Sequence, residues 1–381
     1  EVDPSAKKAR DPTSEKKDSQ ENASTGALGN AQGKATMTVE NLSRKDGLTI
    51  TKDLLKYTIH ATNESNETWK DVKVFNKVPR ELRLVKEKNV LVDGKEVKYT
   101  YDEQDHATPP IRNLEIPVGD IPAKGKKVIT FTFYVDNWAI GKTFTNTVQL
   151  KGSNGQIEVP SQKLTVGKPD GKIEAISAIN LMPNRKKGIA YVGDKVEYTF
   201  HIKNDAVGSV WQEVLFGDMF DFRYMTFNSD EDIVKVDGKE TKDYKYTPAL
   251  GWIQVKLGDI RGGYTDGTGK DVRTVSLTAT VEEGILDSTS HSIELWNGAD
   301  ATSWNQTSVS TRGLPVTVIR RDPGLEAKKE VKNITRNDGK TKVGDTLEYK
   351  VIASNPNSNT IISDVYLDDT LPKGLIFDKS N

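Results

Sequence analysis

The stretch Lys342–Leu375, KVGDTLEYKVIASNPNSNTIISDVYLDDTLPKGL, decides how the rest of the chain is interpreted. After a Val-Gly-Asp turn, apolar residues occupy every second position, namely Leu347, Tyr349, Val351 and Ala353. Successive side chains of a strand point to opposite faces, so this alternation predicts a half-buried antiparallel strand. An Asn-Pro-Ser turn follows, and we expect a second strand that runs to Leu367.

The same landmarks occur twice more upstream, in the same order, which indicates an internal repeat. Each upstream copy has a central alternating strand, a strand that opens with tryptophan, a Val-Asp-Gly-Lys hairpin and a second alternating strand. In the first copy these are Leu54–Asn63, Trp69–Phe75, 92–95 and Lys127–Val135. In the second copy they are 196–204, 211–216, 236–239 and Val272–Val281. Asp-Gly is a preferred two-residue hairpin turn.

We therefore expect an all-β protein made of tandem immunoglobulin-like β-sandwich modules arranged end to end. The expected division is a disordered polar tether over 1–33, a first module over 34–168, a second over 172–321 and an incomplete third over 325–381. The tether lacks the apolar side chains that would offset chain entropy. Short joints containing Pro and Gly connect the modules.

The composition excludes several classes of function. Lys and Arg total 54 and Asp and Glu total 55, whereas a nucleic-acid partner needs a basic excess. Because there is no cysteine, thiol nucleophiles, disulfides and Cys-ligated zinc are ruled out. A multi-module β protein without disulfides fits a bacterial exported protein or a cytosolic one. With no run of 18 apolar residues, we expect no membrane insertion.

The segments 326–332 (EAKKEVK), 343–349 (VGDTLEY) and 369–375 (DTLPKGL), with Asn355, carry a family resemblance. The third copy resembles the DUF11-like, isopeptide-forming repeat of Gram-positive bacterial surface adhesins and fimbrial proteins, and the first two modules resemble it more loosely. The resemblance implies an immunoglobulin-like fold, export and association with the cell wall or peptidoglycan through regions not in this chain. Such proteins act as stalks, pilus parts or adhesins.

The chemistry that this resemblance implies is a bond between a lysine amine and an Asn or Asp side chain, assisted by a buried acid. Lys329, or alternatively Lys332, lies on the first strand of the third module, where that lysine is expected. Its asparagine partner would lie on a last strand that this chain lacks. In the first two modules the expected first strands, 36–40 and 173–179, carry no lysine, although Asn146 matches the last-strand asparagine. We expect no isopeptide bond in those two modules.

The segment LWNGADATSWNQ supplies four candidate ligand-binding residues, Trp296, Asn297, Asp300 and Trp304. Exposed aromatic rings beside amides and carboxylates stack on sugars or dock a partner; alternatively, the two tryptophans cover the open end of the sandwich. Asp230–Asp232 and the loop 264–271 have the clustered oxygens that calcium prefers, but solvated loops are the favoured interpretation. We predict no metal site and no cofactor.

The sequence contains no nucleophile elbow, phosphate-binding glycine loop or metal-spaced histidine pair, so we do not expect an enzyme. We expect a non-catalytic adhesin or stalk region at the extracellular surface of a Gram-positive bacterium. It would present a binding surface to a host or bacterial surface protein or glycan. Two alternatives stay open, namely the carbohydrate-binding modules of a secreted enzyme and a pilus or fibre subunit.

Overall fold

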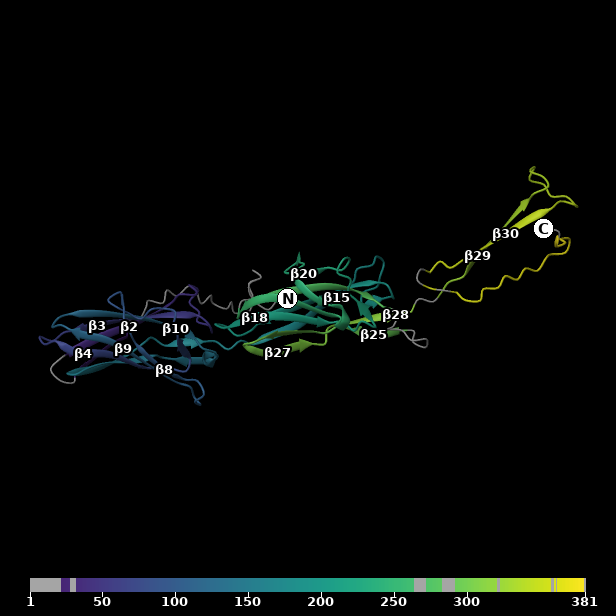
Figure 1. Cartoon of the computed structure of the whole chain (residues 1–381). Coiled ribbons are helices and arrows are strands. Elements are labelled where there is room, and N and C mark those ends of the chain that lie inside the picture. The colour runs from purple at the N-terminus through teal and green to yellow at the C-terminus, as the bar shows by residue number, and fades with distance from the viewer. Residues whose placement is uncertain are drawn as a thin grey trace, which may run out of the picture.

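A computed structural model describes residues 22–27, 32–263, 272–282, 292–320, 323–357, 360 and 362–379. The chain forms strands grouped into three modules; the first two lie in a row and the third, beyond them, turns away from that line (Figure 1). In these ranges the helical elements are two 3-10 turns, Asn137–Ala139 and Pro248–Leu250. No helix in the described part of the chain is long and apolar enough to cross a membrane. The prediction of an all-β chain of tandem sandwich modules is confirmed.

Module 1 consists of two main antiparallel sheets that pack face to face. The first sheet contains β1 (Asn22–Ala27), β2 (Gln32–Asn41), β3 (Leu54–Asn63), β10 (Lys126–Val135), β6 (Leu91–Val92) and β7 (Lys95–Glu96), in that order, with β5 (Leu82–Leu84) also on β10. The second contains β13 (Gly155–Pro160), β12 (Thr147–Gly152), β4 (Trp69–Lys77), β9 (Ile111–Ile121) and β8 (Thr100–Gln104). A short pair, β11 (Lys142–Phe144) and β14 (Leu164–Val166), completes the module.

Module 2 repeats this arrangement. Its first sheet has the order β15 (Gly171–Asn180), β17 (Lys195–Asn204), β24 (Val272–Val281), β20 (Val234–Val236) and β21 (Lys239–Glu240), with β19 (Met225–Thr226) on β24. The facing sheet has β22 (Tyr244–Thr247), β23 (Trp252–Arg261), β18 (Val210–Met219), β26 (Ala299–Ser303) and β27 (Gln306–Thr311). A third, small sheet contains β16 (Ile189–Ala190), β28 (Pro315–Ile319) and β25 (Ser292–Trp296).

The core of each module lies between its two main sheets, where the apolar side of every alternating strand meets its counterpart. In module 1 the rings of Tyr57, Phe131 and Phe133 pack together with centroids 5.4–5.7 Å apart. Trp69 and Trp211 are fully buried at equivalent positions, as expected for core residues rather than recognition residues. Burying such large aromatic side chains supplies much of the hydrophobic stabilisation of a small sandwich.

The predicted Val-Asp-Gly-Lys hairpins are present in both complete modules. Asp93 and Gly94 have φ values of 50° and 74°, and Asp237 and Gly238 have 51° and 77°. Positive φ at both central residues defines the type I′ turn, which matches the twist of the flanking strands. Both aspartates also accept a backbone hydrogen bond from the next strand, at 2.9 Å in each case.

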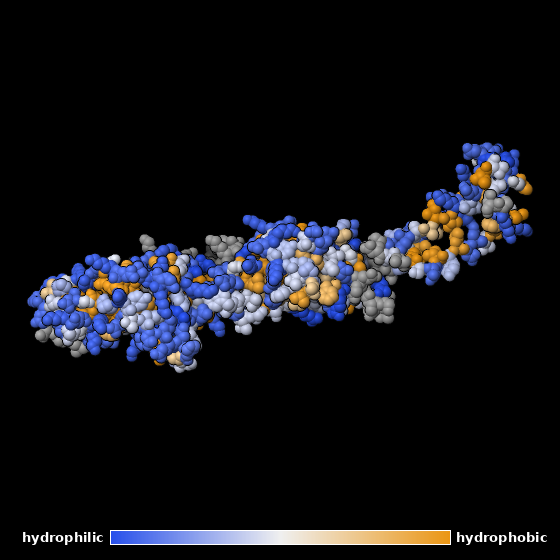
Figure 2. Space-filling view, in the orientation of Figure 1, coloured by the Kyte–Doolittle hydropathy of each residue, from blue (hydrophilic) through white to orange (hydrophobic). Residues whose placement is uncertain are grey.

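Module 3 contains one strand pair, β29 (Glu326–Asn333) and β30 (Leu347–Ser354). The expected second strand, ending at Leu367, is not formed in the described residues 360 and 362–367, so that prediction is wrong. A strand needs partners for its backbone groups, and among the described residues of this module β29 and β30 pair with each other only. Apolar residues consequently stay exposed and appear as orange patches on this module in Figure 2, and they include Val365, Leu367, Ile376 and Phe377.

Strand β1 lies inside the segment 1–33, for which the sequence predicts a disordered tether. In the structure its backbone pairs antiparallel with β2, from Asn22 opposite Met37 to Ala27 opposite Gln32. For residues 22–27 the expectation is therefore wrong. Main-chain hydrogen bonding does not require apolar side chains, so a segment of small residues extends a sheet edge without a hydrophobic signature.

Candidate functional site

The predicted isopeptide lysine, Lys329, lies on β29 and forms an ion pair with a carboxylate. Its Nζ is 2.6 and 2.7 Å from the two oxygens of Asp369 and 4.8 Å from the ring centroid of Tyr349. The two charged side chains are 42% and 37% exposed, so solvent screens this pair. Lys332 is three residues further along the strand and therefore points to the opposite face from Lys329.

Strand register identifies the residues that replace Lys329 in the complete modules. Each module has an aspartate at the turn before its central strand, and the sixth residue after it is Val351, Phe200 or Ile59. The strand partners of these three residues are Lys329, Ala175 and Met37. Met37 is fully buried, and Ala175 packs against the core of module 2. The lysine position is thus apolar in both complete modules.

The position of the carboxylate of Asp369 also has equivalents in the other two modules. They can be identified from a residue with an irregular backbone conformation that precedes this position in each module. A residue with positive φ occurs within β4 and β18, at Asp71 and Glu213, and at Asp364 in the corresponding segment of module 3, with φ of 53°, 52° and 54°. Five residues later the chain has Asn76 in module 1, Asp218 in module 2 and Asp369 in module 3. The acid is therefore present in two modules and replaced by its amide in the first.

Asp218 is a carboxyl group buried inside module 2. It has no solvent exposure, and its Oδ2 accepts a hydrogen bond of 2.8 Å from Asn297 Nδ2. Its Oδ1 has no hydrogen-bond partner among the described residues. Burial raises the pKa of Asp218 to about 8, and burial also raises the pKa of nearby Asp300. Sequence reasoning missed this acid, although alignment of the repeats on Asp369 identifies it.

Module 1 has two amides where module 2 has an acid and an amide. Asn76 Nδ2 donates to Asn146 Oδ1 at 2.7 Å, and Asn146 Nδ2 donates back to Asn76 Oδ1 at 3.2 Å. Both side chains are buried, so the reciprocal bonds satisfy groups that would otherwise be costly to desolvate. Among the described residues, modules 2 and 3 therefore each combine two parts of the predicted lysine, acid and asparagine set, module 1 has the asparagine alone, and none combines all three.

The four predicted ligand-binding residues do not form one surface. Asn297 is buried against Asp218, so it faces the core. Trp296 ends β25, where the guanidinium of Arg312 lies 3.9 Å from its ring centroid. Trp304 follows the far end of β26 and lies at the boundary with module 1. Strand β26 separates the two tryptophans along its length, and Asn297, in the turn between β25 and β26, is held inside the module by its hydrogen bond to Asp218.

The boundary between modules 1 and 2 is a packed joint. Thr51 Oγ1 donates a 2.6 Å hydrogen bond to Gln212 Oε1, and both side chains are buried. Lys52 Nζ lies 3.4 Å from Glu213 and 4.8 Å from the ring centroid of Trp304. Within the connection, a Cβ added to Gly167 would lie 2.5 Å from a module 2 backbone oxygen, so the linker is held against that module.

Lys52 has an unusual backbone conformation for its position in the joint. Its φ is 69°, whereas modules 2 and 3 have glycine at the equivalent turn position, Gly193 and Gly344. A residue with a Cβ costs about 1–2 kcal/mol in this left-handed region, and such strain marks positions with another role. Here the lysine side chain contacts the next module, which a glycine cannot do.

A groove of about 760 Å³ lies on the outer face of the β13-β12-β4-β9-β8 sheet of module 1. Strand register places part of its lining in two parallel rows across the sheet. One row reads Glu158, Gln149, Phe75, Glu115, Thr100 from β13 to β8. The other row reads Lys77, Asn113, Asp102. Local sequence pattern indicates each strand separately and could not show which outward residues are neighbours.

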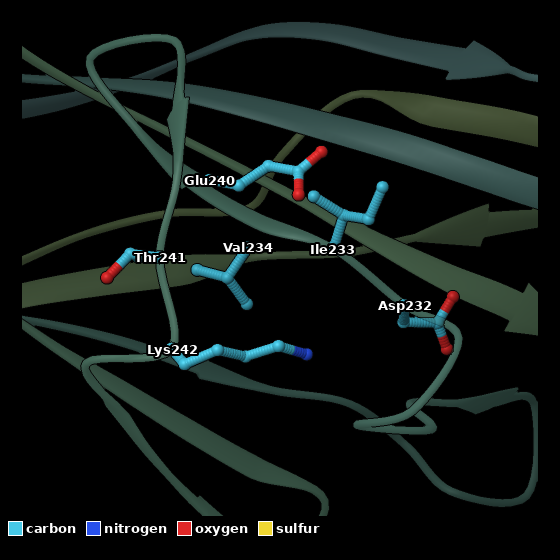
Figure 3. A pocket seen from close by; sticks show the side chains of 6 residues that line it. All are labelled: Asp232, Ile233, Val234, Glu240, Thr241 and Lys242. Carbon is cyan, nitrogen blue, oxygen red and sulfur yellow. The ribbon is translucent and has the colours of Figure 1, made fainter.

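A smaller hollow, of about 110 Å³, lies beside the β20–β21 hairpin of module 2 (Figure 3). Asp232, which lines it, belongs to one of the calcium candidates considered above. Its carboxylate already accepts hydrogen bonds from the Asn228 backbone at 2.7 Å and from Thr278 at 2.9 Å, and it lies 3.1 Å from Lys195. The described residues contain no cluster of three or more potential metal ligands. The loop 264–271 lies outside the described residues.

No family model matches this sequence, and no curated protein does. Among solved structures, the chain is similar to the C-terminal domain of the Streptococcus agalactiae AgI/II polypeptide BspA, with 11% identity, coverage of 75% of this chain and 99% of that chain, and a TM-score of 0.38. The Bacillus cereus major pilin subunit BcpA has 14% identity, coverage of 77% and 81%, and a TM-score of 0.28. The N-terminal domain of the Streptococcus gordonii adhesin Sgo0707 has 11% identity, coverage of 82% of this chain and 83% of that chain, and a TM-score of 0.27. Likeness this distant assigns no function to this chain.

Proposed function

We propose that this chain is a non-catalytic stalk and adhesin region of a Gram-positive surface protein. In this proposal the modules act as spacers at the extracellular face of the cell wall and present a binding surface to ligands on a host or a neighbouring cell. The resemblance of the third repeat to surface-protein repeats motivates the location. The observation that supports the role as a spacer is the packed joint between modules 1 and 2.

A spacer must hold its modules apart in a defined direction. The joint supports this role because it combines a buried side-chain hydrogen bond, a charge pair and a cation over an aromatic ring, contributed by Thr51, Lys52, Gln212, Glu213 and Trp304. Linked domains without such an interface move relative to each other by default. The backbone strain at Lys52 is further support, since a glycine would satisfy the turn alone.

The experiment that tests this proposal displays the whole chain through an unrelated wall anchor on a non-adherent Gram-positive bacterium. We expect the displayed chain to increase attachment to host epithelial cells or to other bacteria, compared with cells that carry the anchor alone. Attachment equal to that of the anchor alone, with the chain detected at the surface by antibody, would overturn the adhesive role.

A further inference from the structure

The groove on module 1 runs across the strands rather than along one of them. Its long row includes one residue from each of five strands, and neighbouring strands are about 4.8 Å apart, so the row extends over roughly 19 Å. Backbone groups of the inner strands are already paired within the sheet. A ligand in the groove is therefore recognised by side chains and does not add a strand.

The groove combines one aromatic ring with a line of hydrogen-bonding groups. Phe75 is half-buried at the centre of the row and has Gln149 on one side and Glu115 on the other. Aromatic rings offer an apolar face, and a few placed amides, hydroxyls and carboxylates fix orientation in small-ligand sites. A pyranose ring has the complementary chemistry, with C–H bonds on its face and hydroxyl groups around its edge.

The charges of the groove argue for a neutral ligand. The lining has three carboxylates, Asp102, Glu115 and Glu158, and one cation, Lys77, so an acidic ligand is repelled. The three carboxylates also do not come together to form one binding site for a basic ligand. Asp102 and Glu158 are on the two outermost strands, and Glu115 is already paired with Lys73 at 2.6 Å.

We propose that this groove binds a neutral oligosaccharide that lies across the strands of module 1, with one pyranose ring stacked on Phe75. The inference deepens the proposed function and rests on it, because it names the ligand class and the site of the adhesive surface.

Module 2 provides an internal comparison for this site. The residues equivalent to Gln149, Phe75 and Glu115 are Asp300, Gly217 and Gln254. Gly217 has no ring for a sugar to stack on, and a Cβ there would lie 2.9 Å from Asp300 Oδ1 and 3.2 Å from Trp252 Nε1, so a larger residue would require these side chains to move. The oligosaccharide site is therefore a property of module 1 alone.

The test uses the full chain on a printed array of neutral, sialylated and sulfated oligosaccharides, followed by titration calorimetry with any neutral oligosaccharide that binds. Phe75→Thr keeps a residue suited to a strand and removes the ring, and Gln149→Ala removes one hydrogen-bonding group. Lys151→Thr is the matched control, since Lys151 is exposed on the same face of β12 outside the groove. Thermal unfolding of each variant verifies that module 1 is intact.

We expect binding to neutral oligosaccharides that becomes about tenfold weaker in Phe75→Thr, weaker in Gln149→Ala and unchanged in Lys151→Thr. Absence of any neutral binder, binding of acidic glycans only, or equal affinity in folded Phe75→Thr would overturn the inference. Binding of Lys- or Arg-rich peptides in the groove instead would also overturn it. If displayed Phe75→Thr chain still promotes attachment as the native chain does, this inference fails while the adhesive function stands.

Discussion

Thr51 and Gln212 are 161 residues apart in the chain and are joined by a buried 2.6 Å hydrogen bond between their side chains. This bond crosses from one sandwich to the next, and Gln212 is itself held in place because its backbone N–H donates to Asn305 at 3.1 Å. The joint is thus built from groups that are fixed within each module. A joint of this kind transmits the orientation of one module to the next.

The strained turn at Lys52 yields a prediction with two opposite effects. Lys52→Gly removes the left-handed strain, so module 1 should become more stable by up to about 1 kcal/mol in chemical denaturation. The same change removes the contacts with Glu213 and Trp304, so limited proteolysis of the linker 167–170 should become faster. Lys124→Gly is the control, because Lys124 also has a positive φ, of 59°, outside the joint. Slower or unchanged linker cleavage in Lys52→Gly would argue against a role in the joint.

Asp218 should make module 2 less stable as the pH rises. Because burial raises the pKa of the folded group to about 8, the folded state binds a proton that the unfolded state releases near pH 4. Stability is therefore greatest below the unfolded pKa and falls between about pH 4 and pH 8, on the order of a few kcal/mol. Asp218→Asn, which imitates Asn76 of module 1, should remove most of this slope in denaturation curves. A slope that persists in the variant would assign it to other groups.

Asp194 should have the opposite effect on how the stability of module 2 depends on pH. Burial opposes ionisation, but hydrogen bonds from Arg185, Asn180 and the Tyr191 backbone lower the pKa of Asp194 overall. Its contribution to stability is present above the pKa that Asp194 has in the unfolded state. It is lost as the pH falls through the pKa of the folded state. Asp194→Ala leaves Arg185 unpaired and should destabilise module 2 by about 3–5 kcal/mol at neutral pH.

Asp205→Ala is the matched control for Asp194→Ala. Asp205 lies in the same module and has a longer, exposed ion pair with Lys203 at 3.8 Å, which should contribute less than about 1 kcal/mol. Similar losses of unfolding free energy for the two variants, measured by urea unfolding, would contradict a stabilising role for the ion pair between Asp194 and Arg185.

The intact mass of the chain should equal the sum of its residue masses plus one water, as for a chain without an internal side-chain bond. Lys329 has its acid but the first two modules have Met37 and Ala175 in the lysine position, so no module contains lysine, acid and asparagine together. High-resolution mass spectrometry of the unfolded chain measures this directly. Loss of one ammonia or one water would show that an internal side-chain bond has formed after all.

Periodicity predicted the strands well where one face is buried. β3 and β24 have the predicted bounds, Leu54–Asn63 and Val272–Val281, because alternation leaves little freedom in where such a strand starts and ends. Residues Thr143–Leu150 also largely alternate between apolar and polar, but β11 ends at Phe144 and β12 starts at Thr147, so the strand is interrupted at Thr145 and Asn146. Asn146 turns inward to bond Asn76, a contact between strands that local pattern does not contain.

The candidate sites depend on contacts that are distant in sequence, and for this reason the sequence alone was a poor guide to them. The groove requires the register of five strands, and the joint requires two modules to meet. Trp304 illustrates the limit: its neighbours in the sequence suggest ligand binding, and only the structure places it at the joint, with Lys52 Nζ 4.8 Å from its ring centroid. Asp218 was within reach, since repeat alignment equates it with Asp369, but its burial follows only from the packed sandwich.

The central claim is that modules 1 and 2 form a rigid rod segment. Double electron–electron resonance, which measures the distance between two spin labels, tests it most directly. The chain has no cysteine, so spin labels at Asn66→Cys and Lys239→Cys, both exposed positions, attach without competing sites. We predict one narrow distance distribution for the native joint and a broad one for Thr51→Ala combined with Gln212→Ala. A broad distribution with the native joint, as for modules that pivot freely, would contradict the claim.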